Sequence, residues 1–307
     1  MTSQSPPGRP LEELRYALAE ADTHRPPVAL RTRVIEAAEA GRPPGRAAGT
    51  DTAITPIEAY RRTMVSFDSV LSDLSEAEWH TPVLRDLDIQ GLVGHLIGVE
   101  RQLHAALGIG PDMVTDADHV ESTQADAHAQ TGRPTADTHA EWLDLSAATV
   151  AHASGLDRQG LASLIAMHLF TTSVERMLVI RSFETWTHEE DIRRATGRPL
   201  AAPDSARLRL MTETAVSALP AGLAMIARPR PNRTARMVLT GPGGGTWQAS
   251  LDRGVPGETD VRIIADAVSF CRMVANRMTP ADIEAVVTGD EALAADVFAG
   301  AQALALD

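Results

Sequence analysis

The sequence predicts a two-domain α+β protein in which a four-helix bundle precedes a small α/β domain and follows a helical N-terminal arm. Apolar residues recur every three or four positions through four long segments in the first two thirds of the chain, which is typical of amphipathic helices. After residue 201 the pattern changes to short β-rich segments that alternate with helices. The length of 307 residues is also more than one compact core usually holds.

The arm is expected over residues 1–53. Two short amphipathic patterns, at 10–21 and 27–40, are followed by the Pro- and Gly-rich linker GRPPGRAAGTDT. Helices of this length are marginally stable on their own. We therefore expect the arm to dock on the rest of the chain or on another chain, and we favour packing or a loose arm over a partner-binding role.

The bundle is expected over residues 54–200. One helix is predicted to begin after Thr55, a second after Asp88 and a third around Trp142, each with apolar residues at helical spacing. A polar stretch at residues 111–134 separates the second helix from the third. Together with a fourth helix, these segments describe a four-helix bundle, a fold that often holds a site between its helices.

The fourth helix, expected over residues 172–199, carries the most informative pattern. Glu184 and His188 are four positions apart, so their side chains project from the same face of the helix. Asp191 falls on that face too. A carboxylate and an imidazole in this arrangement are two potential ligands of a metal ion, and a third ligand must come from another element.

His95, on the second helix, is the best candidate for the third ligand because it lies beside the apolar stripe and faces inward. Its neighbours Glu100 and Arg101 are expected to be solvated. Two imidazoles and one carboxylate leave an open coordination position, which is typical of catalytic zinc and also suits Fe²⁺ or Ni²⁺. The alternative is a surface ion pair at Glu184 and His188, with His95 as a core histidine.

The last segment, residues 201–307, is expected to form the α/β domain. A helix at 204–227 precedes the strand-like segments ARMVLTG, GTWQASL and DVRIIAD. The GPGGG between the first two predicts a hairpin turn rather than a phosphate loop, because no helix follows it and no lysine closes it. A helix that contains Cys271, a fourth strand and a closing helix complete a domain with its helices packed on one face of the strands.

Composition excludes several classes of function. The net charge of −13 argues against nucleic acid or an anionic membrane as the partner. No apolar run approaches the ~18 residues that a membrane span needs. The sequence has no lysine, which excludes a Schiff-base lysine and a phosphate-loop lysine. With one cysteine and no signal-peptide core, we expect a cytoplasmic protein. We expect it to be a monomer or a homodimer.

Three segments together resemble the mycothiol-dependent maleylpyruvate isomerase family: ETWTHEEDIRRATGRP, the GHLIGVE helix upstream, and the tail FCRMVANRMTPADIEAVVTGDEALA. The resemblance covers residues 54–307. It implies a DinB-like metal-binding bundle followed by a domain similar to sterol carrier protein. It also implies that His95, Glu184 and His188 bind a divalent metal ion, with zinc as the first choice.

The resemblance further implies mycothiol as a thiol cosubstrate and a small electrophile, such as an unsaturated keto acid, as the substrate. In the family's isomerase reaction the thiolate adds to a cis double bond, the resulting single bond rotates, and the thiol leaves to give the trans product. A transferase stops after addition or displacement. Because a metal-coordinated thiol loses its proton, the open coordination position is consistent with either reaction.

Two other functions stay open alongside the isomerase or S-transferase. One is a metal-dependent enzyme of hydrolase type that uses activated water, and the other is a non-catalytic regulatory or binding protein that retains the metal site. Dependence on an added thiol would favour the isomerase or transferase over the hydrolase.

Two further residues are candidates for catalysis. Asp191 is expected either to orient a metal ligand or to pair with Arg194 or Arg181. Arg277 is the first candidate for recognising a substrate acid, because the guanidinium fork suits a carboxylate. Arg181, Arg193 and Arg194 are weaker candidates, and Arg193 is the weakest on that helix because it projects opposite Glu184. Cys271 is expected to be a buried, inert thiol.

Overall fold

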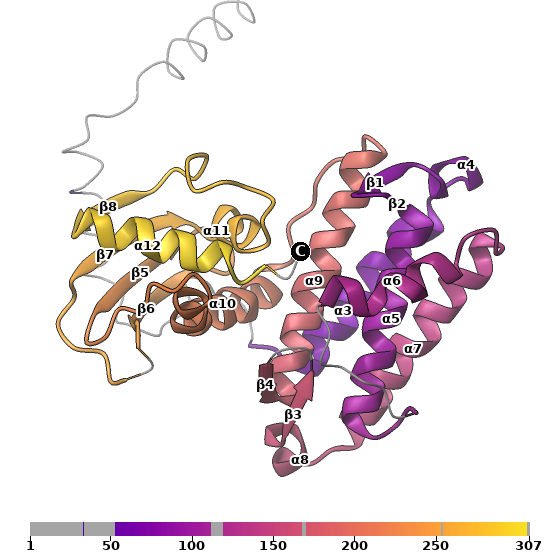
Figure 1. The fold of residues 1–307 in the computed structure, drawn as a ribbon, viewed down its shortest axis with the longest axis horizontal. Coiled ribbons are helices and arrows are strands. Elements are labelled where there is room, and N and C mark those ends of the chain that lie inside the picture. Colours follow the sequence, from indigo (N-terminus) through magenta and orange to yellow (C-terminus); the bar gives the residue numbers. More distant parts are fainter. Residues whose placement is uncertain (1–32, 34–52, 112–118, 168–169, 253, 306–307) are drawn as a thin grey trace, which may run out of the picture. The chain divides into compact units, whose positions relative to one another are not determined.

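The computed structural model describes residues 33, 53–111, 119–167, 170–252 and 254–305. These residues form a helical bundle followed by a mixed sheet with helices, which confirms the predicted α+β class (Figure 1). The predicted arm lies outside the described residues except at its positions 33 and 53. Among the described helices, none combines the length and apolar character that crossing a bilayer requires.

Four long helices make up the bundle, as the sequence predicts. They are α3 (Pro56–Ser72), α5 (Ile89–Leu107), α7 (Thr135–Gly155) and α9 (Val174–Ala195). The shorter elements are α4 (Glu76–Trp79), α6 (His119–Ala129), α8 (Arg158–Ala162) and the hairpins β1–β2 (Pro82–Leu84, Leu87–Asp88) and β3–β4 (Leu164–Met167, Phe170–Ser173).

Local capping sets the helix starts. The Thr55 side chain accepts a hydrogen bond from the backbone N–H of Glu58 at 3.1 Å, and the Asp88 side chain caps α5 through Gly91 at 2.8 Å. Each cap satisfies a backbone donor that has no partner inside the helix. At the other end of α5, Gly108 adopts a left-handed conformation with φ of 70°. The predicted caps of α3 and α5 are therefore present.

Helix α6 is an element that the sequence did not predict. It lies within the polar stretch 111–134 and shows no apolar stripe, so periodicity could not reveal it. Two glycines of α5 let it pack closely: a Cβ added to Gly94 would lie 2.9 Å from the Cα of Ala127, and one added to Gly98 would lie 2.8 Å from a carboxylate oxygen of Asp126. Close packing against α5 therefore accommodates a helix with little hydrophobic pattern of its own.

The C-terminal part is a four-stranded mixed sheet with three helices. In chain order its elements are α10 (Ser205–Met225), β5 (Thr234–Thr240), β6 (Gly245–Ser250), β7 (Val261–Asp266), α11 (Ala267–Val274), β8 (Val286–Gly289) and α12 (Glu291–Gln302). The strand order is β6-β5-β7-β8, with β5 and β7 parallel and the two edge strands antiparallel to their neighbours. Gly241 and Gly243 supply the positive φ angles of the predicted β5–β6 hairpin turn.

Helix α9 contributes side chains to each of the three hydrophobic clusters. Leu178 packs in the main core of the bundle, and Val174 packs in a smaller cluster with β3 and the end of α5. Val179 and Trp186 pack with the helices and sheet of the C-terminal part. Residues 44–307 form one compact unit, so the bundle and the C-terminal part are not separated at residue 200. The domain boundary there stays a prediction.

Replacing Gly222 with alanine is expected to destabilise the C-terminal part. A Cβ at this position of α10 would lie 1.9 Å from the backbone oxygen of Gly300 in α12, and overpacking of this kind costs about 1–3 kcal/mol. Gly155→Ala in α7 is the matched control, since an added Cβ there meets no atom within 4 Å. Urea unfolding of both variants measures the difference. Equal stability of Gly222→Ala and the wild type would contradict this helix packing.

Candidate metal centre

The three predicted metal ligands lie together inside the bundle. One potential ligand atom from each of His95, Glu184 and His188 lies within 4.8 Å of the other two, and this is the one such group of His, Cys, Asp and Glu side chains that the described residues contain. His95 Nε2 is 3.4 Å from Glu184 Oε1. The two imidazole rings are 5.5 Å apart and nearly perpendicular.

The chemistry and spacing of these donors fit a divalent ion. Nitrogen and oxygen donors bound to one zinc ion at about 2.1 Å lie roughly 3.4 Å apart in tetrahedral geometry. The observed spacing therefore needs only small side-chain movements. His95 and His188 are buried, and the Glu184 side chain is 17% exposed. Glu184 is thus the most exposed of the three side chains.

Hydrogen bonds orient both imidazoles. His95 Nδ1 is 2.7 Å from Oγ1 of Thr123 in α6, and His188 Nδ1 is 3.1 Å from Oδ2 of Asp191. In each ring the Nδ1 atom is engaged, which leaves Nε2 as the donor for a metal ion. The sequence predicted Asp191 as a residue that orients a ligand but missed Thr123, which lies in the stretch read as merely polar.

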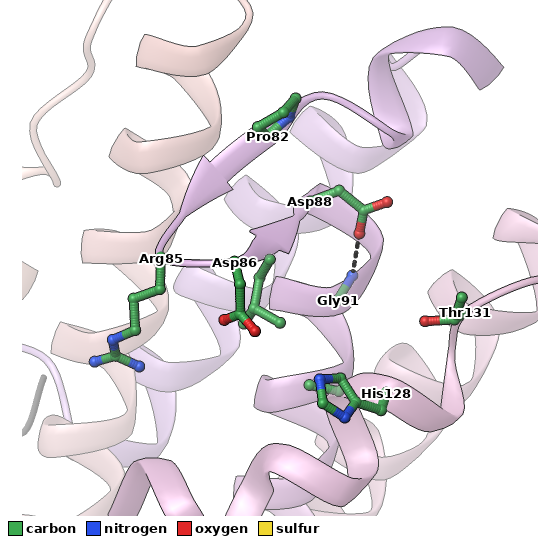
Figure 2. Close-up of a pocket in the computed structure, with 9 residues that line it drawn as sticks. Pro82, Arg85, Asp86, Asp88, Gly91, His128 and Thr131 are labelled. Carbon is green, nitrogen blue, oxygen red and sulfur yellow. Dashed lines mark hydrogen bonds between the residues drawn. The ribbon is translucent and has the colours of Figure 1, made fainter.

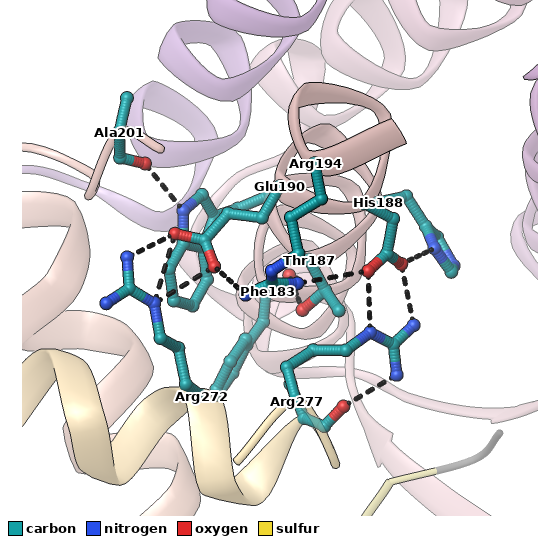
Figure 3. A network of polar contacts seen from close by, with 11 residues as sticks. Phe183, Thr187, His188, Glu190, Arg194, Ala201, Arg272 and Arg277 are labelled. Carbon is teal, nitrogen blue, oxygen red and sulfur yellow. Dashed lines mark hydrogen bonds and ion pairs between the residues drawn. The ribbon is translucent and has the colours of Figure 1, made fainter. Parts of the chain in front are cut away.

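Asp191 is held by two arginines as well as by His188. Arg277 donates from Nε to Oδ1 at 2.8 Å and from Nη2 to Oδ2 at 2.7 Å, and Arg194 lies 3.4 Å from Oδ1 (Figure 3). Burial alone would raise the pKa of Asp191, but the hydrogen bonds from His188 and Arg277 outweigh it and hold the pKa at about 2. Asp191 is therefore ionised and can only accept, so His188 Nδ1 is the donor of their hydrogen bond. Asp191 thus contacts both His188 and Arg194, and its role in orienting a metal ligand stays a prediction.

Arg277 lies one side chain away from His188, after the end of α11. Besides Asp191 it bonds the backbone oxygen of Ala275 at 2.9 Å. A neighbouring pair, Arg272 and Glu190, joins α11 to α9 at distances down to 2.6 Å (Figure 3). The C-terminal part thus contributes two arginines to the face of α9 that carries His188. A role for Arg277 in recognising a substrate acid stays a prediction.

The expectation that Glu100 is solvated is wrong. Its side chain is fully buried, as is that of Arg181, whose Nε and Nη2 each lie 3.0 Å from Glu100 Oε1. Arg181 Nη1 also donates to Glu184 Oε2. Burial alone would lower the pKa of Arg181, but Glu184 and Glu100 raise it, so the guanidinium stays charged. A charge placed off the apolar stripe of α5 is accommodated inside the bundle because an arginine from α9 pairs with it.

Three other predicted residues are accounted for away from the ligands. Arg101, also expected to be solvated, is half-exposed and bonds Asp126 and Glu141. Arg193 pairs with Glu189 at 2.9 Å, in keeping with its predicted direction away from Glu184. Cys271 is buried, and burial, with a smaller contribution from Asp266, raises the pKa of its thiol.

A separate depression of about 280 Å³ lies between the β1–β2 hairpin and the helices α5 and α6 (Figure 2). Arg85, Asp86 and His128 are among its polar lining residues, and Asp88 at its edge caps α5 through Gly91. None of the five predicted site residues lines it. We therefore assign no part of the metal centre to this depression.

Comparisons with known proteins bear on the family of the bundle and on the fold. Residues 60–193 match the family model described as the mycothiol maleylpyruvate isomerase N-terminal domain. The bundle belongs to this domain family. Two crystal structures, of the mycothiol-dependent maleylpyruvate isomerase and of a histidine-to-alanine mutant, align with TM-scores of 0.51 and 0.52. At 14% identity, over 75% of this chain and 91% of theirs, they show a shared fold. No curated protein matches the sequence.

The mycothiol maleylpyruvate isomerase domain of the chain contains the three candidate ligands and Asp191, whereas Arg277 lies beyond residue 193, where the match ends. The predicted family is confirmed by this match, which supports an enzyme of the isomerase or S-transferase kind. The likeness of the C-terminal part to sterol carrier protein stays a prediction.

Proposed function

We propose that the chain is a divalent-metal-dependent enzyme that uses mycothiol as a thiol cosubstrate and acts on a small electrophile. The reaction is a cis–trans isomerisation of the maleylpyruvate type or a thiol S-transfer. The observation that carries the proposal is the convergence of His95, Glu184 and His188 on one point inside a mycothiol maleylpyruvate isomerase domain. Zinc is the proposed ion, and Fe²⁺ or Ni²⁺ suits the same donors.

In this proposal His95 and His188 hold the ion through Nε2 and Glu184 holds it through Oε1. When bound, the ion supplies a positive charge that favours the thiolate form of an incoming thiol at neutral pH. The contacts of Thr123 and Asp191 at Nδ1 would keep Nε2 of each imidazole available to the ion. Three protein ligands leave a coordination position for the thiol.

The chain's own side chains offer no competing nucleophile of comparable strength. Its one thiol, Cys271, is buried and its pKa is raised, and the sequence contains no lysine. The open metal position is then the natural place to generate a nucleophile, from an incoming thiol or from bound water. This agrees with a family that takes its thiol as a cosubstrate.

Arg277 is proposed to serve the substrate as well as Asp191. It carries a buried positive charge beside His188, and its side chain is 10% exposed. An acidic substrate that approaches the ligands meets this charge, and a guanidinium can bind a carboxylate with two hydrogen bonds. The residue thus links recognition of the acid group to the orientation of His188.

Metal content tests the ligand assignment. Wild-type protein purified without exposure to a chelator is expected to contain about one divalent ion per chain. The variants His95→Ala and His188→Ala are expected to lose this ion, because removal of one of three ligands sharply weakens metal binding. His128→Ala, which removes an exposed histidine, is the control. Elemental analysis of wild-type protein that finds no metal would show the assignment to be wrong.

Thiol dependence tests the cosubstrate. With maleylpyruvate as the substrate, turnover is expected to require mycothiol and to be weaker with glutathione, while Cys271→Ser keeps most of the activity because the buried thiol takes no part. The assay is formation of the trans product with and without added thiol. Full turnover in thiol-free buffer would contradict a thiol-dependent mechanism and would favour metal-activated water as the nucleophile.

Substitution of Arg277 tests recognition of the substrate acid. Loss of a charged hydrogen-bond donor costs about 1.5–3 kcal/mol, so Arg277→Ala is expected to raise KM by about tenfold or more. Arg193→Ala, which removes an arginine that pairs with Glu189 on α9, is the control. An unchanged KM in Arg277→Ala would contradict a role for the residue in recognising the substrate acid.

A further inference from the structure

Behind Glu184 lies a buried polar network that draws one residue from each long helix of the bundle. Its members are Tyr60 from α3, Glu100 from α5, Thr149 from α7 and Arg181 from α9, and each is fully buried. Buried polar and charged groups cost free energy unless they are paired. A network of this kind at the junction of four helices therefore calls for an explanation beyond packing.

Glu100 is the centre of the network. Its Oε1 atom accepts hydrogen bonds from Nε and Nη2 of Arg181 at 3.0 Å and from the hydroxyl of Tyr60, and its Oε2 atom accepts from Thr149 at 2.8 Å. Burial and the charge of Glu100 raise the pKa of Tyr60, so its phenol stays protonated and donates. These contacts direct the side chain of Glu100 at Arg181.

Arg181 connects the network to the candidate ligand. Its Nη1 atom donates to Oε2 of Glu184, while Oε1 of Glu184 faces Nε2 of His95 at 3.4 Å. One carboxylate oxygen is thus fixed by the arginine and the other is directed at the imidazoles. The arginine therefore sets the orientation of Glu184.

The charges of the network matter as much as its geometry. A lone guanidinium beside Glu184 would neutralise the carboxylate and repel a cation at the same place. Glu100 supplies a second negative charge, so that the group of Glu100, Arg181 and Glu184 has a net charge of −1, counted from one arginine and two carboxylates. Because Glu100 and Arg181 are fully buried, water screens their interaction little.

We propose that Glu100 is a positioning residue that balances the charge of Arg181 and thereby leaves Glu184 oriented and negatively charged for a divalent cation. The inference rests on the proposed metal site, since it assigns a function to residues that do not touch the ion. It predicts that removing the charge of Glu100 weakens cation binding even though every ligand remains.

The test measures Zn²⁺ and Co²⁺ affinity of the full chain by competition with a chromophoric chelator. Substitution of groups that support metal ligands typically weakens affinity about 10–100-fold, and a loss in this range is expected for Glu100→Gln. Tyr60→Phe removes one hydrogen bond to Glu100 and is expected to cause a smaller loss in the same direction. Glu141→Gln, in a network with Arg101 and Arg133, is the control and is expected to bind as the wild type does.

A double variant separates charge balance from simple packing. If Glu100 acts by balancing Arg181, then E100Q/R181Q should bind the cation more tightly than Glu100→Gln, because the uncompensated guanidinium is gone. A purely structural role predicts that the second substitution makes binding weaker still. The absorption spectrum of the Co²⁺ protein reports on the ligand geometry in each variant, and circular dichroism without metal reports on folding.

The outcomes are distinct. If folded Glu100→Gln binds the cation as tightly as the wild type, or if the double variant binds it more weakly than Glu100→Gln, the inference about Glu100 is wrong. Neither result contradicts the proposed metal site. Absence of cation binding by the wild type overturns the proposed function itself. If Glu100→Gln does not fold, Tyr60→Phe decides: a reduced affinity supports the inference and an unchanged affinity overturns it.

Discussion

The structure depends on one constraint, which is that the buried carboxylates of α9 must each meet a positive charge. Glu190 and Asp191 are almost fully buried on this helix, and the side chain of Glu184 is 17% exposed. An unpaired carboxylate in such a place costs several kcal/mol. Arginines from different elements satisfy the constraint: Arg181 on α9 itself bonds Glu184, while Arg272 and Arg277 in the C-terminal part bond the other two.

Pairing of these charges connects the C-terminal part to the candidate ligands. The contact runs from Arg277 through Asp191 to His188, so residues beyond the matched family domain help to fix the imidazole. On the other side of the ligands, Glu100 and Arg181 do the same for Glu184. The ligands are therefore oriented from two directions by ion pairs, as the outer-shell partners of metal ligands commonly are.

Local signals explain what the sequence could predict. The cap at Asp88 depends on residues that are close together in the chain. The shared direction of Glu184 and His188 follows from the period of one helix. Glu100 was misplaced because a charged residue off the apolar stripe normally faces water, and its partner Arg181 is 81 positions away in the sequence. Thr123 was missed because α6 has no apolar stripe and packs through glycines of the helix beside it.

The most direct test of the account is the absorption spectrum of the cobalt-substituted protein during titration with mycothiol. If His95, Glu184 and His188 hold the ion and leave one position open, the thiol should enter that position as a thiolate. The account predicts a new near-ultraviolet charge-transfer band that saturates with mycothiol and is absent in His188→Ala. A cobalt spectrum that mycothiol does not change, at thiol concentrations that support turnover, would contradict it.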